Sequence, residues 1–224
     1  EGVTGSGKTE VYLQVIAHAL AQQRSALILV PEIALTPQLG ARLQQRFGTS
    51  VATFHSALSA AERKTQWERV ATQEVRVAMG ARSALFLPLR NLGLIIVDEE
   101  HDASFKQDDA PRYHGRDLAV WRGSLEGAVV ILGTATPSLE SSFNVEQKRY
   151  QHLQLTQRVE SRPLPKVELI DLTRVEMAGN GLLSIPLCHA LERILSLGEQ
   201  AILFLNRRGF APYIYCRDCG ASFR

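Results

Sequence analysis

The amino-acid sequence predicts an α/β fold in which a parallel β-sheet carries helices on both faces. Short apolar segments alternate with longer amphipathic segments over residues 9–148, and this order of strand, loop and helix is typical of parallel sheets. The most apolar segment, Leu92–Val97, has the continuous hydrophobicity of a strand that is buried on both faces. A glycine-rich loop, Gly2–Thr9, precedes the first amphipathic segment. Together these features indicate an α/β protein with a phosphate-binding loop.

The composition is that of an ordinary globular protein. The 224 residues carry a formal net charge of +2 and are 45% hydrophobic, which is enough for one large domain or one and a half smaller ones. No apolar run approaches the roughly 20 residues of a membrane-spanning helix, and no signal peptide is visible, so we expect no membrane partner. The three cysteines do not form a secreted disulfide framework, which favours the cytoplasm. The chain begins at the phosphate loop, and we expect it to be a piece of a longer protein.

The loop GVTGSGKT matches the phosphate-binding pattern G-x-x-x-x-G-K-[ST] in full. Its glycines allow the backbone N–H groups to turn towards phosphate oxygens, and a helix expected over residues 9–22 directs its positive end at the same anion. Lys8 would reach the terminal phosphates, and the Thr9 hydroxyl would ligate Mg²⁺. The predicted phosphate site is made of Gly2, Val3, Thr4, Gly5, Ser6, Gly7, Lys8 and Thr9.

Three carboxylates and a histidine, Asp98, Glu99, Glu100 and His101, follow the buried strand directly. The carboxyl ends of strands are where open α/β sheets bind ligands. Burying three carboxylates side by side costs several kcal/mol, on the order expected for unpaired ions, unless a cation or hydrogen bonds compensate. Mg²⁺ held by a carboxylate and by substrate phosphates is the compensating ion that the nearby phosphate loop suggests.

Further elements follow from local patterns. Ser59 and Glu62 form a capping box, and Thr36–Pro37 and Thr136–Pro137 have the pattern of helix starts. We expect His55 and Trp67 to have structural roles. The predicted strands cover residues 26–30, 51–54, 75–79 and 128–132, the last of them buried, and the predicted helices cover residues 37–47, 60–72, 117–125 and 137–148.

The loop at residues 103–117 mixes aromatic and cationic side chains. This composition suits single-stranded nucleic acid, on which each stacked base contributes about 1–3 kcal/mol. The alternative is a solvated loop whose aromatic rings tuck into its own base. Because the loop directly follows the acids, we favour a ligand-sensing role. The candidate contacts are Phe105, Lys106, Arg112, Tyr113 and His114.

The pattern changes after residue 149. We expect strands at residues 150–155 and 167–172, a flexible turn at 178–181, an amphipathic helix at 186–197 and a buried strand at 200–205. Cys188 on that helix is predicted to lie in the core. Arg207 and Arg208 could face phosphate or DNA, or simply solvent. Cys216 and Cys219 have the spacing of half a zinc site, whose remaining ligands would lie beyond residue 224.

Five segments in this order, GVTGSGKTE, LVPEIALTPQ, DEEH, GTATPS and FLNRRGFAP, resemble the DEAH-type helicases of superfamily 2. The resemblance covers the whole chain and is most specific to the primosomal replication-restart helicases of bacteria. It implies a RecA-like, ATP-binding first lobe at residues 1–148 and a linker or hairpin region at 149–181. It also implies the start of a second RecA-like lobe at 182–215, which a zinc-binding insertion interrupts from residue 216.

The same resemblance implies an ATP-dependent DNA helicase that moves 3′ to 5′ on forked or single-stranded DNA during replication restart. Lys8, Asp98 and Glu99 would be catalytic: Lys8 would hold the phosphates, Thr9 and Asp98 would hold Mg²⁺, and Glu99 would activate the attacking water. The partners would be single-stranded DNA-binding protein and other primosome proteins, in the nucleoid region of the cytoplasm. The remaining roles would be DNA contact for Arg82, Ser83 and the aromatic loop, coupling of hydrolysis to movement for Thr134, Ala135 and Thr136, and Zn²⁺ binding for Cys216 and Cys219.

Alternative functions remain open at this point. A DEAH-type box does not distinguish DNA from RNA, so an RNA helicase is one alternative. A nucleic-acid and partner recruitment module with secondary ATPase activity is another. A small-molecule kinase is not favoured, because no acceptor site or lid is visible. Ala81 stands where the resemblance predicts Thr, which weakens any hydroxyl–phosphate contact there. We expect the isolated chain to bind nucleotide poorly and to hydrolyse it slowly or not at all.

Overall fold

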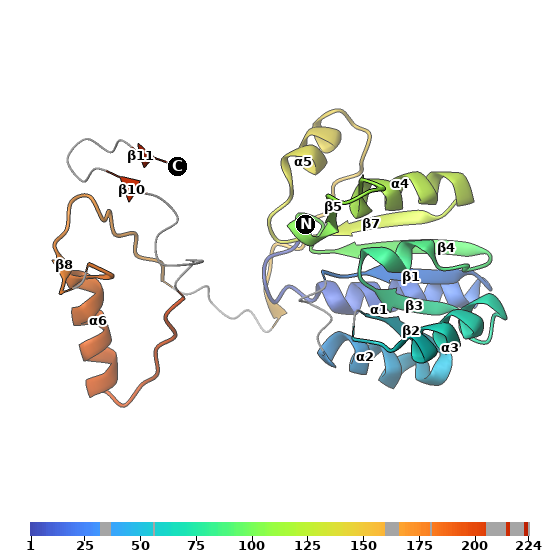
Figure 1. Cartoon of the computed structure of the whole chain (residues 1–224), viewed down its shortest axis with the longest axis horizontal. Helices are drawn as coiled ribbons and strands as arrows, with labels where there is room; N and C mark the ends of the chain where they lie inside the picture. The colour runs from blue at the N-terminus through green and yellow to red at the C-terminus, as the bar shows by residue number, and fades with distance from the viewer. Residues whose placement is uncertain are drawn as a thin grey trace. The chain divides into compact units, whose positions relative to one another are not determined.

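The computed structural model describes residues 1–31, 37–55, 57–159, 166–179 and 181–204, with only the backbone of 37–38, 214–215 and 222–223. The chain divides into two compact units, residues 1–163 and 164–224, which are considered separately here (Figure 1). Among the described residues, no helix is both long and apolar enough to cross a membrane.

The first unit is built on a five-stranded sheet with the order β2-β3-β1-β4-β7, in which every pair of neighbouring strands is parallel. This confirms the predicted parallel α/β fold. The six residues of β4 from Leu92 to Val97 are apolar or glycine and buried, and Asp98 at its end is only partly buried. The strands are β1 (Ser25–Leu29), β2 (Val51–Phe54), β3 (Val77–Gly80), β4 (Leu92–Asp98) and β7 (Val129–Gly133).

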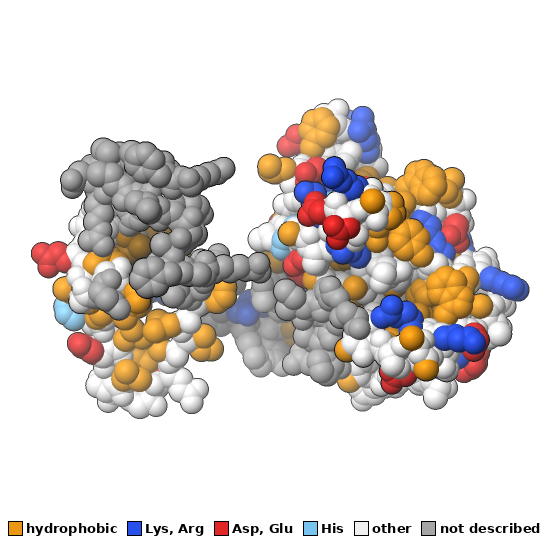
Figure 2. Space-filling model, in the orientation of Figure 1, with side chains coloured by type: hydrophobic (Ala, Val, Ile, Leu, Met, Phe, Trp, Pro, Cys, Tyr) orange, Lys and Arg blue, Asp and Glu red, His pale blue; other side chains and the backbone are white. Residues whose placement is uncertain are grey.

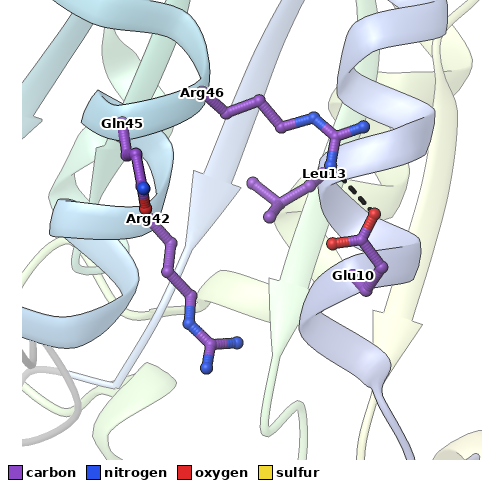
Figure 3. A pocket seen from close by; sticks show the side chains of 5 residues that line it. All are labelled: Glu10, Leu13, Arg42, Gln45 and Arg46. Carbon is purple, nitrogen blue, oxygen red and sulfur yellow. Dashed lines mark hydrogen bonds and ion pairs between the residues drawn. The ribbon is translucent and has the colours of Figure 1, made fainter.

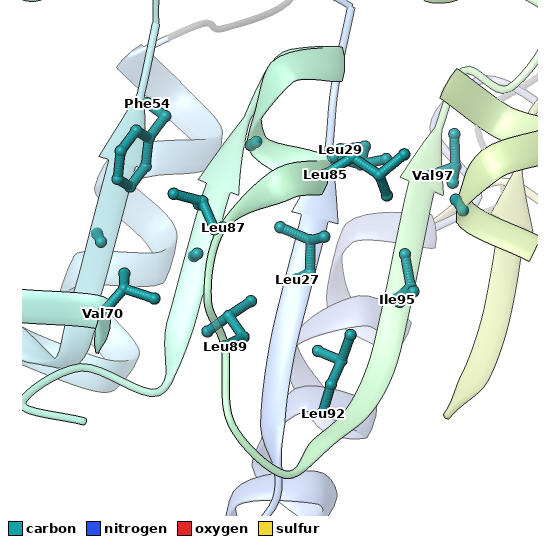
Figure 4. Close-up of a cluster of buried hydrophobic side chains, with 14 of the residues drawn as sticks. Leu27, Leu29, Phe54, Val70, Leu85, Leu87, Leu89, Leu92, Ile95 and Val97 are labelled. Carbon is teal, nitrogen blue, oxygen red and sulfur yellow. The ribbon is translucent and has the colours of Figure 1, made fainter. Parts of the chain in front are cut away.

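Helices cover both faces of this sheet, as the alternating pattern predicts (Figure 1). One core cluster joins α1 and α2 to the sheet, and a second, shown in Figure 4, joins the opposite face to α3, η3 and α4. Their bounds are α1 (Lys8–Ala21), α2 (Pro37–Phe47), η2 (Gly48–Ser50), α3 (Ala60–Ala71), η3 (Arg82–Phe86), η4 (Ala103–Phe105), α4 (Gly115–Glu126) and α5 (Leu139–Glu146), with the two-stranded hairpin β5 (Lys106–Gln107) and β6 (Tyr113–His114) before α4.

Two helix starts show how far local patterns determine helix boundaries. The predicted capping box is present: the Ser59 hydroxyl accepts from the Glu62 N–H, and the Glu62 carboxylate accepts from the Ser59 N–H. The start predicted at Thr136–Pro137 is wrong, because α5 begins two residues later. Ser138 is its N-cap, and the Ser138 hydroxyl accepts from the Ser141 N–H. Thr36 lies outside the described residues.

The strand predicted at residues 128–132 is present as β7, but its predicted burial is wrong. Its first residue, Val129, is 62% exposed, and Val130, Ile131 and Leu132 are only partly buried. The reason is position, because β7 is the last strand of the described sheet and pairs with β4 alone.

Among its described residues, the second unit contains the helix α6 (Ile185–Ser196), close to the helix predicted at residues 186–197. A hairpin of β8 (Met177–Ala178) and β9 (Leu183–Ser184) flanks the predicted turn. Beyond it, the structure describes the backbone of a second small hairpin, β10 (Ile214–Tyr215) and β11 (Ser222–Phe223). Cys188 is only half-buried, so the prediction that it belongs to a core is wrong.

Three predicted strands do not form over their described residues. Residues 150–155 contribute only a single bridge, between Leu155 and Gly2, and residues 167–172 and 200–204 have no strand pairing. Apolar side chains there stay exposed: Ile202, for example, is 96% exposed. An apolar run becomes a strand only when another strand pairs with it, and no described strand lies beside these segments.

The central strand β4 predicts where the sheet is sensitive to substitution. Ile95 is fully buried between β1 and β7, so Ile95→Ala removes packed atoms and leaves a cavity. We expect its free energy of unfolding to fall by about 2–5 kcal/mol, measured by urea denaturation. Val129→Ala, on the exposed end of β7, is the control and should change it by less than about 0.5 kcal/mol. Equal losses in both variants would contradict the observed burial.

Candidate active site

The phosphate loop ends at α1, and the Lys8 side chain lies over the loop. Gly7 is the N-cap of α1 with a φ of 87°, a left-handed conformation that a residue with a side chain rarely adopts. The Lys8 ammonium group donates a hydrogen bond of 2.8 Å to the Gly2 carbonyl oxygen. This hydrogen bond holds the Lys8 charge against the loop for which the pattern predicts phosphate binding.

Backbone hydrogen bonds hold this loop from two sides. On one side, the Gly2 N–H donates to the Thr134 carbonyl oxygen at 2.9 Å. On the other, Val3 donates to the Leu155 carbonyl oxygen, and Val159 donates to the Gly5 carbonyl oxygen. The loop is thus fixed between the end of β7 and the segment at residues 155–159, which follows α5 in the sequence.

The residues present fit a nucleotide phosphate and Mg²⁺. The Ser6 hydroxyl, in the middle of the loop, is buried and has no hydrogen-bond partner within the described part of the chain, so it has donor capacity that a phosphate oxygen would satisfy. Within the described residues, no group of three or more His, Cys, Asp or Glu side chains is arranged to hold a metal ion by itself. Mg²⁺ would here have one carboxylate, Asp98, and the Thr9 hydroxyl as protein ligands, which is the usual way this ion binds beside phosphates.

Asp98 is at the carboxyl end of β4, and one of its carboxylate oxygens accepts a hydrogen bond from the protein. The Tyr12 hydroxyl donates to Asp98 Oδ1 at 2.8 Å. Burial raises the pKa of Tyr12, and the negative charge of Asp98 raises it further, so this hydroxyl remains a proton donor at neutral pH.

Glu99 lies at a sharp turn directly after the strand. Its φ is 48°, in the left-handed region, and the Asp102 N–H donates to its carbonyl oxygen at 2.8 Å. A non-glycine residue in this region carries strain of about 1–3 kcal/mol, and such residues are concentrated at functional sites. Burial raises the pKa of the Glu99 carboxyl, and the Asp98 charge adds to this rise, while the nearby charges of Lys8 and His101 oppose it. A carboxylate of increased basicity is suited to accept a proton from water.

Glu100 points into a different environment and is completely buried. Its carboxylate accepts hydrogen bonds from the Arg116 guanidinium, from the Ser138 N–H and hydroxyl, and from the Ser141 hydroxyl. Burial alone would raise the pKa of Glu100, but these hydrogen bonds outweigh it and lower the pKa. Protein groups therefore compensate this charge, so the expectation that Mg²⁺ compensates all three acids is wrong for Glu100.

His101 connects the acids to the end of β7. Its Nδ1 atom lies 2.8 Å from the Thr134 hydroxyl, which also accepts from the Thr136 N–H at 3.0 Å. The carbonyl oxygen of the same Thr134 accepts from Gly2 in the phosphate loop. The predicted coupling segment of Thr134, Ala135 and Thr136 is thus in direct contact with both the phosphate loop and the DEEH sequence.

The candidate nucleic-acid contacts separate into anchoring and exposed residues. Phe105 is completely buried and packs in the core, so the prediction that it contacts nucleic acid is wrong. For this ring the alternative is confirmed, in which the aromatic side chain packs into the base of its own loop. Arg82 donates to the carbonyl oxygens of Ser104 and Lys106 and so anchors the loop. Tyr113 lies edge-on to Phe86, with ring centroids 5.5 Å apart, and Phe86 is 54% exposed.

The polar candidates around these rings differ in charge. Ser83, Lys106 and Arg112 are exposed. Burial lowers the pKa of His114, so this side chain is neutral near pH 7 and would not form an ion pair with phosphate. Figure 2 shows hydrophobic side chains interspersed with Lys and Arg on the visible face of the first unit.

An open groove of about 500 Å³ lies between α1 and α2 (Figure 3). Glu10 and Arg46 form an ion pair of 2.8 Å across it. The described residues that line it are Glu10, Leu13, Arg42, Gln45 and Arg46, and none of them belongs to the predicted sites. We assign no chemistry to this groove. Arg207, Arg208, Cys216 and Cys219 lie outside the described residues, so their predicted roles remain predictions.

Sequence reasoning missed three contributors to the site: Tyr12, Gly133 and Phe86. Tyr12 had a detectable signal, because it follows Lys8 by four residues and so lies on the same face of α1. Gly133 and Phe86 gave none, since their importance depends on neighbours from distant parts of the chain.

Comparison with known proteins identifies the class to which this fold and site belong. The family model for DEAD/DEAH box helicases matches residues 1–144. The chain therefore belongs to the DEAD/DEAH box helicase family.

The relatives are more specific. The chain is 48% identical over 220 residues to the replication restart protein PriA of Bacillus subtilis, which covers 98% of this chain and 27% of the relative. It is also 48% identical over 225 residues to PriA of Synechocystis, with the same coverage of both chains. PriA of Rickettsia felis is 44% identical over the whole chain, which spans 34% of that protein. The chain thus corresponds to about a third or less of these relatives, and the resemblance to replication-restart helicases is confirmed.

A solved structure supports the fold. The helicase domain of Pyrococcus furiosus Hef superposes with a TM-score of 0.50 at 18% identity, over 71% of this chain and 34% of that one. The first unit therefore has a RecA-like fold, in agreement with the helicase family model that matches it.

The Glu100 cluster predicts a specific loss of stability. Glu100→Gln removes the buried carboxylate beside the Arg116 guanidinium, which keeps the more exposed carboxylates of Asp117 and Glu140. We therefore expect the free energy of unfolding to fall by about 1.5–3 kcal/mol at pH 7. Because the pKa of Glu100 is lowered in the folded state, its stabilisation is complete above the pKa of the unfolded chain, about 4.3, and is lost as the pH falls through the folded value. The difference between wild type and variant in urea denaturation should therefore shrink below about pH 4.

Glu140→Gln is the matched control for this prediction. Glu140 also faces Arg116, at 3.5 Å, but is mostly exposed, so its loss should cost less than about 1 kcal/mol. Equal effects of Glu100→Gln and Glu140→Gln would show that burial of the pair has no special importance.

Proposed function

We propose that the chain is the first motor lobe, with the start of the second, of a 3′-to-5′ DNA helicase that couples ATP hydrolysis to translocation at forked DNA in replication restart. The observation that carries this proposal is the arrangement around Thr134. The Thr134 carbonyl oxygen is hydrogen-bonded to the phosphate loop, and the Thr134 hydroxyl is hydrogen-bonded to His101 of the DEEH sequence. The family membership and the PriA relatives support the same function.

Each residue of the site has a role in this proposal. Lys8 binds the terminal phosphates of ATP, and Thr9 and Asp98 hold Mg²⁺, which neutralises phosphate charge when it is bound. Glu99 orients the attacking water and accepts its proton, for which its raised pKa is suited. At about 4 Å and an effective dielectric constant near 20, one Lys–phosphate pair is worth on the order of 4 kcal/mol, so we expect ATP binding to depend on Lys8.

The nucleic-acid surface in this proposal is the pair Phe86 and Tyr113 with the exposed Lys106, Arg112 and Ser83. Bases stack on the aromatic rings, and the cations bind the backbone phosphates. Arg82 acts by holding the loop through the carbonyl oxygens of Ser104 and Lys106. This loop continues into α4, where Arg116 donates a hydrogen bond to Glu100. A contact with DNA at the loop is therefore connected to the acids through the chain and through this hydrogen bond.

The remaining parts of the proposal rest on the relatives and on the sequence. The proposal includes action at the nucleoid in the bacterial cytoplasm, with single-stranded DNA-binding protein and primosome proteins as partners. Cys216 and Cys219 supply the first two ligands of a Zn²⁺ site, and Arg207 and Arg208 provide a further cationic contact. The isolated chain, without the rest of the second lobe, hydrolyses ATP slowly or not at all.

The decisive experiment measures the ATPase rate of the full-length protein with forked DNA, with RNA and without nucleic acid. We expect DNA, but not RNA, to stimulate the ATPase rate. Lys8→Ala and Glu99→Gln should each reduce the DNA-stimulated rate by about 100-fold or more, since phosphoryl transfer depends on charge stabilisation and on an oriented water.

Lys64→Ala, on the exposed surface of α3, is the control for loss of a lysine charge and should leave the rate unchanged. Stimulation by RNA instead of DNA would replace the proposed substrate. An unchanged rate in Glu99→Gln would exclude the role given to that residue.

A second prediction concerns the aromatic pair. Phe86→Ala and Tyr113→Ala should each weaken the binding of single-stranded DNA by about 1–3 kcal/mol, because each removes a stacking surface. Fluorescence anisotropy with a labelled oligonucleotide at fixed salt measures this change. Trp121→Ala, an exposed aromatic residue on α4, is the control, and an equal loss in that variant would point to a nonspecific effect.

A further inference from the structure

We propose that Tyr12 is a positioning residue for the metal ligand Asp98, and that Gly133 is required because its missing side chain leaves the space that Tyr12 occupies. The inference deepens the proposed function and rests on it, since it assumes that Asp98 holds Mg²⁺ with ATP. It concerns three residues from three separate elements, α1, β4 and β7.

The first observation is the rigidity of the Tyr12 side chain. The residue is only 4% exposed and belongs to the core cluster that joins α1 to the sheet, together with Leu13 and Ile16. The hydroxyl at the end of the ring donates to Asp98 Oδ1 at 2.8 Å. A donor at the end of a packed ring has little freedom, so it fixes the acceptor in one orientation.

The second observation is the space above Gly133. Gly133 lies directly opposite Asp98 in the pairing of β4 with β7. A β-carbon at Gly133 would lie 1.7 Å from the Tyr12 hydroxyl oxygen and 2.8 Å from the ring carbon that bears it. Any side chain at residue 133 would therefore push the hydroxyl away from Asp98. The backbone of Gly133 is not left-handed, so its conformation does not require glycine. The close approach of the Tyr12 hydroxyl does.

The physical consequence concerns the carboxylate itself. A carboxylate at the end of a strand can rotate about its terminal bonds, and a hydrogen bond to one oxygen restricts that rotation and directs the other oxygen. Residues that hydrogen-bond to metal ligands in this way typically change metal affinity by about 10–100-fold when they are substituted. Lys8 and Thr9 precede Tyr12 on the same helix, so α1 both binds the nucleotide and positions the acid opposite it.

Direct metal binding tests this role independently of turnover. Mn²⁺, as a spectroscopically visible substitute for Mg²⁺, is titrated into the full-length protein saturated with ADP, and bound ion is measured by electron paramagnetic resonance. Tyr12→Phe keeps the ring and removes the hydroxyl. We expect its dissociation constant for Mn²⁺ to rise about tenfold, with only the small fall in melting temperature that loss of one hydrogen bond causes and with the metal-free affinity for ADP unchanged. A change smaller than about twofold overturns the proposal.

Tyr150→Phe is the matched control, because Tyr150 lies near Asp117 and Arg116 and not at Asp98. Its Mn²⁺ affinity should equal that of the wild type. Gly133→Ala gives an independent test: the displaced hydroxyl should produce the same rise in the dissociation constant, and the double variant with Tyr12→Phe should show no further rise, because both act on one contact. Additive effects would contradict the shared contact.

The two levels of inference can fail separately. If the wild type binds Mn²⁺ with ADP and Tyr12→Phe weakens it, but DNA does not stimulate hydrolysis, the motor proposal fails and the role of Tyr12 stands. If the wild type does not hold Mn²⁺ in the presence of ADP, both are overturned.

Discussion

Three adjacent carboxylates at the end of a buried strand are the constraint on which the rest of the site depends. The structure separates them by giving each a different partner. Asp98 receives the Tyr12 hydroxyl, Glu99 is turned aside by a left-handed backbone conformation, and Glu100 enters a buried cluster around Arg116. Like charges in one site would oppose ionisation of each other, so this separation allows the acids to have different functions. Glu100 accepts from an arginine and from three further donors, which leaves Asp98 and Glu99 as the candidates for chemistry.

The Glu100 cluster also explains why the surrounding loops lie where they do. Its donors come from the start of α4 and the start of α5, so one buried charge joins the end of the aromatic loop to the segment after β7. Replacing such a buried pair by apolar residues is often neutral for stability, whereas losing one partner is costly. The cluster is therefore better understood as fixing geometry than as a source of net stability. Its position between the candidate DNA contacts and the acids makes that geometry relevant to coupling.

The sequence predicted those features that depend on local patterns. The phosphate loop, the buried β4 and the capping box at Ser59 are each encoded within about ten neighbouring residues, and all three are present. The predictions were wrong where the structure of a segment depends on which distant segment packs against it. Residues 200–204 are apolar but exposed, since no described strand pairs with them, and β7 is less buried than its composition predicts because it pairs on one side only. Likewise, Phe105 was counted among exposed rings because composition does not tell which ring packs inward.

The backbone contacts of the phosphate loop bear on the energetics of nucleotide binding. Hydrogen bonds to Thr134, Leu155 and Val159 already fix the loop, so little backbone entropy remains to be lost when a ligand binds. The change falls on side chains. Lys8 must exchange its charged hydrogen bond to the Gly2 carbonyl oxygen, worth about 1.5–3 kcal/mol net, for an ion pair whose Coulomb energy is on the order of 4 kcal/mol. In the proposed motor, binding energy is therefore not used to order the loop. This binding energy remains available for moving the elements that Thr134 and His101 connect to the loop.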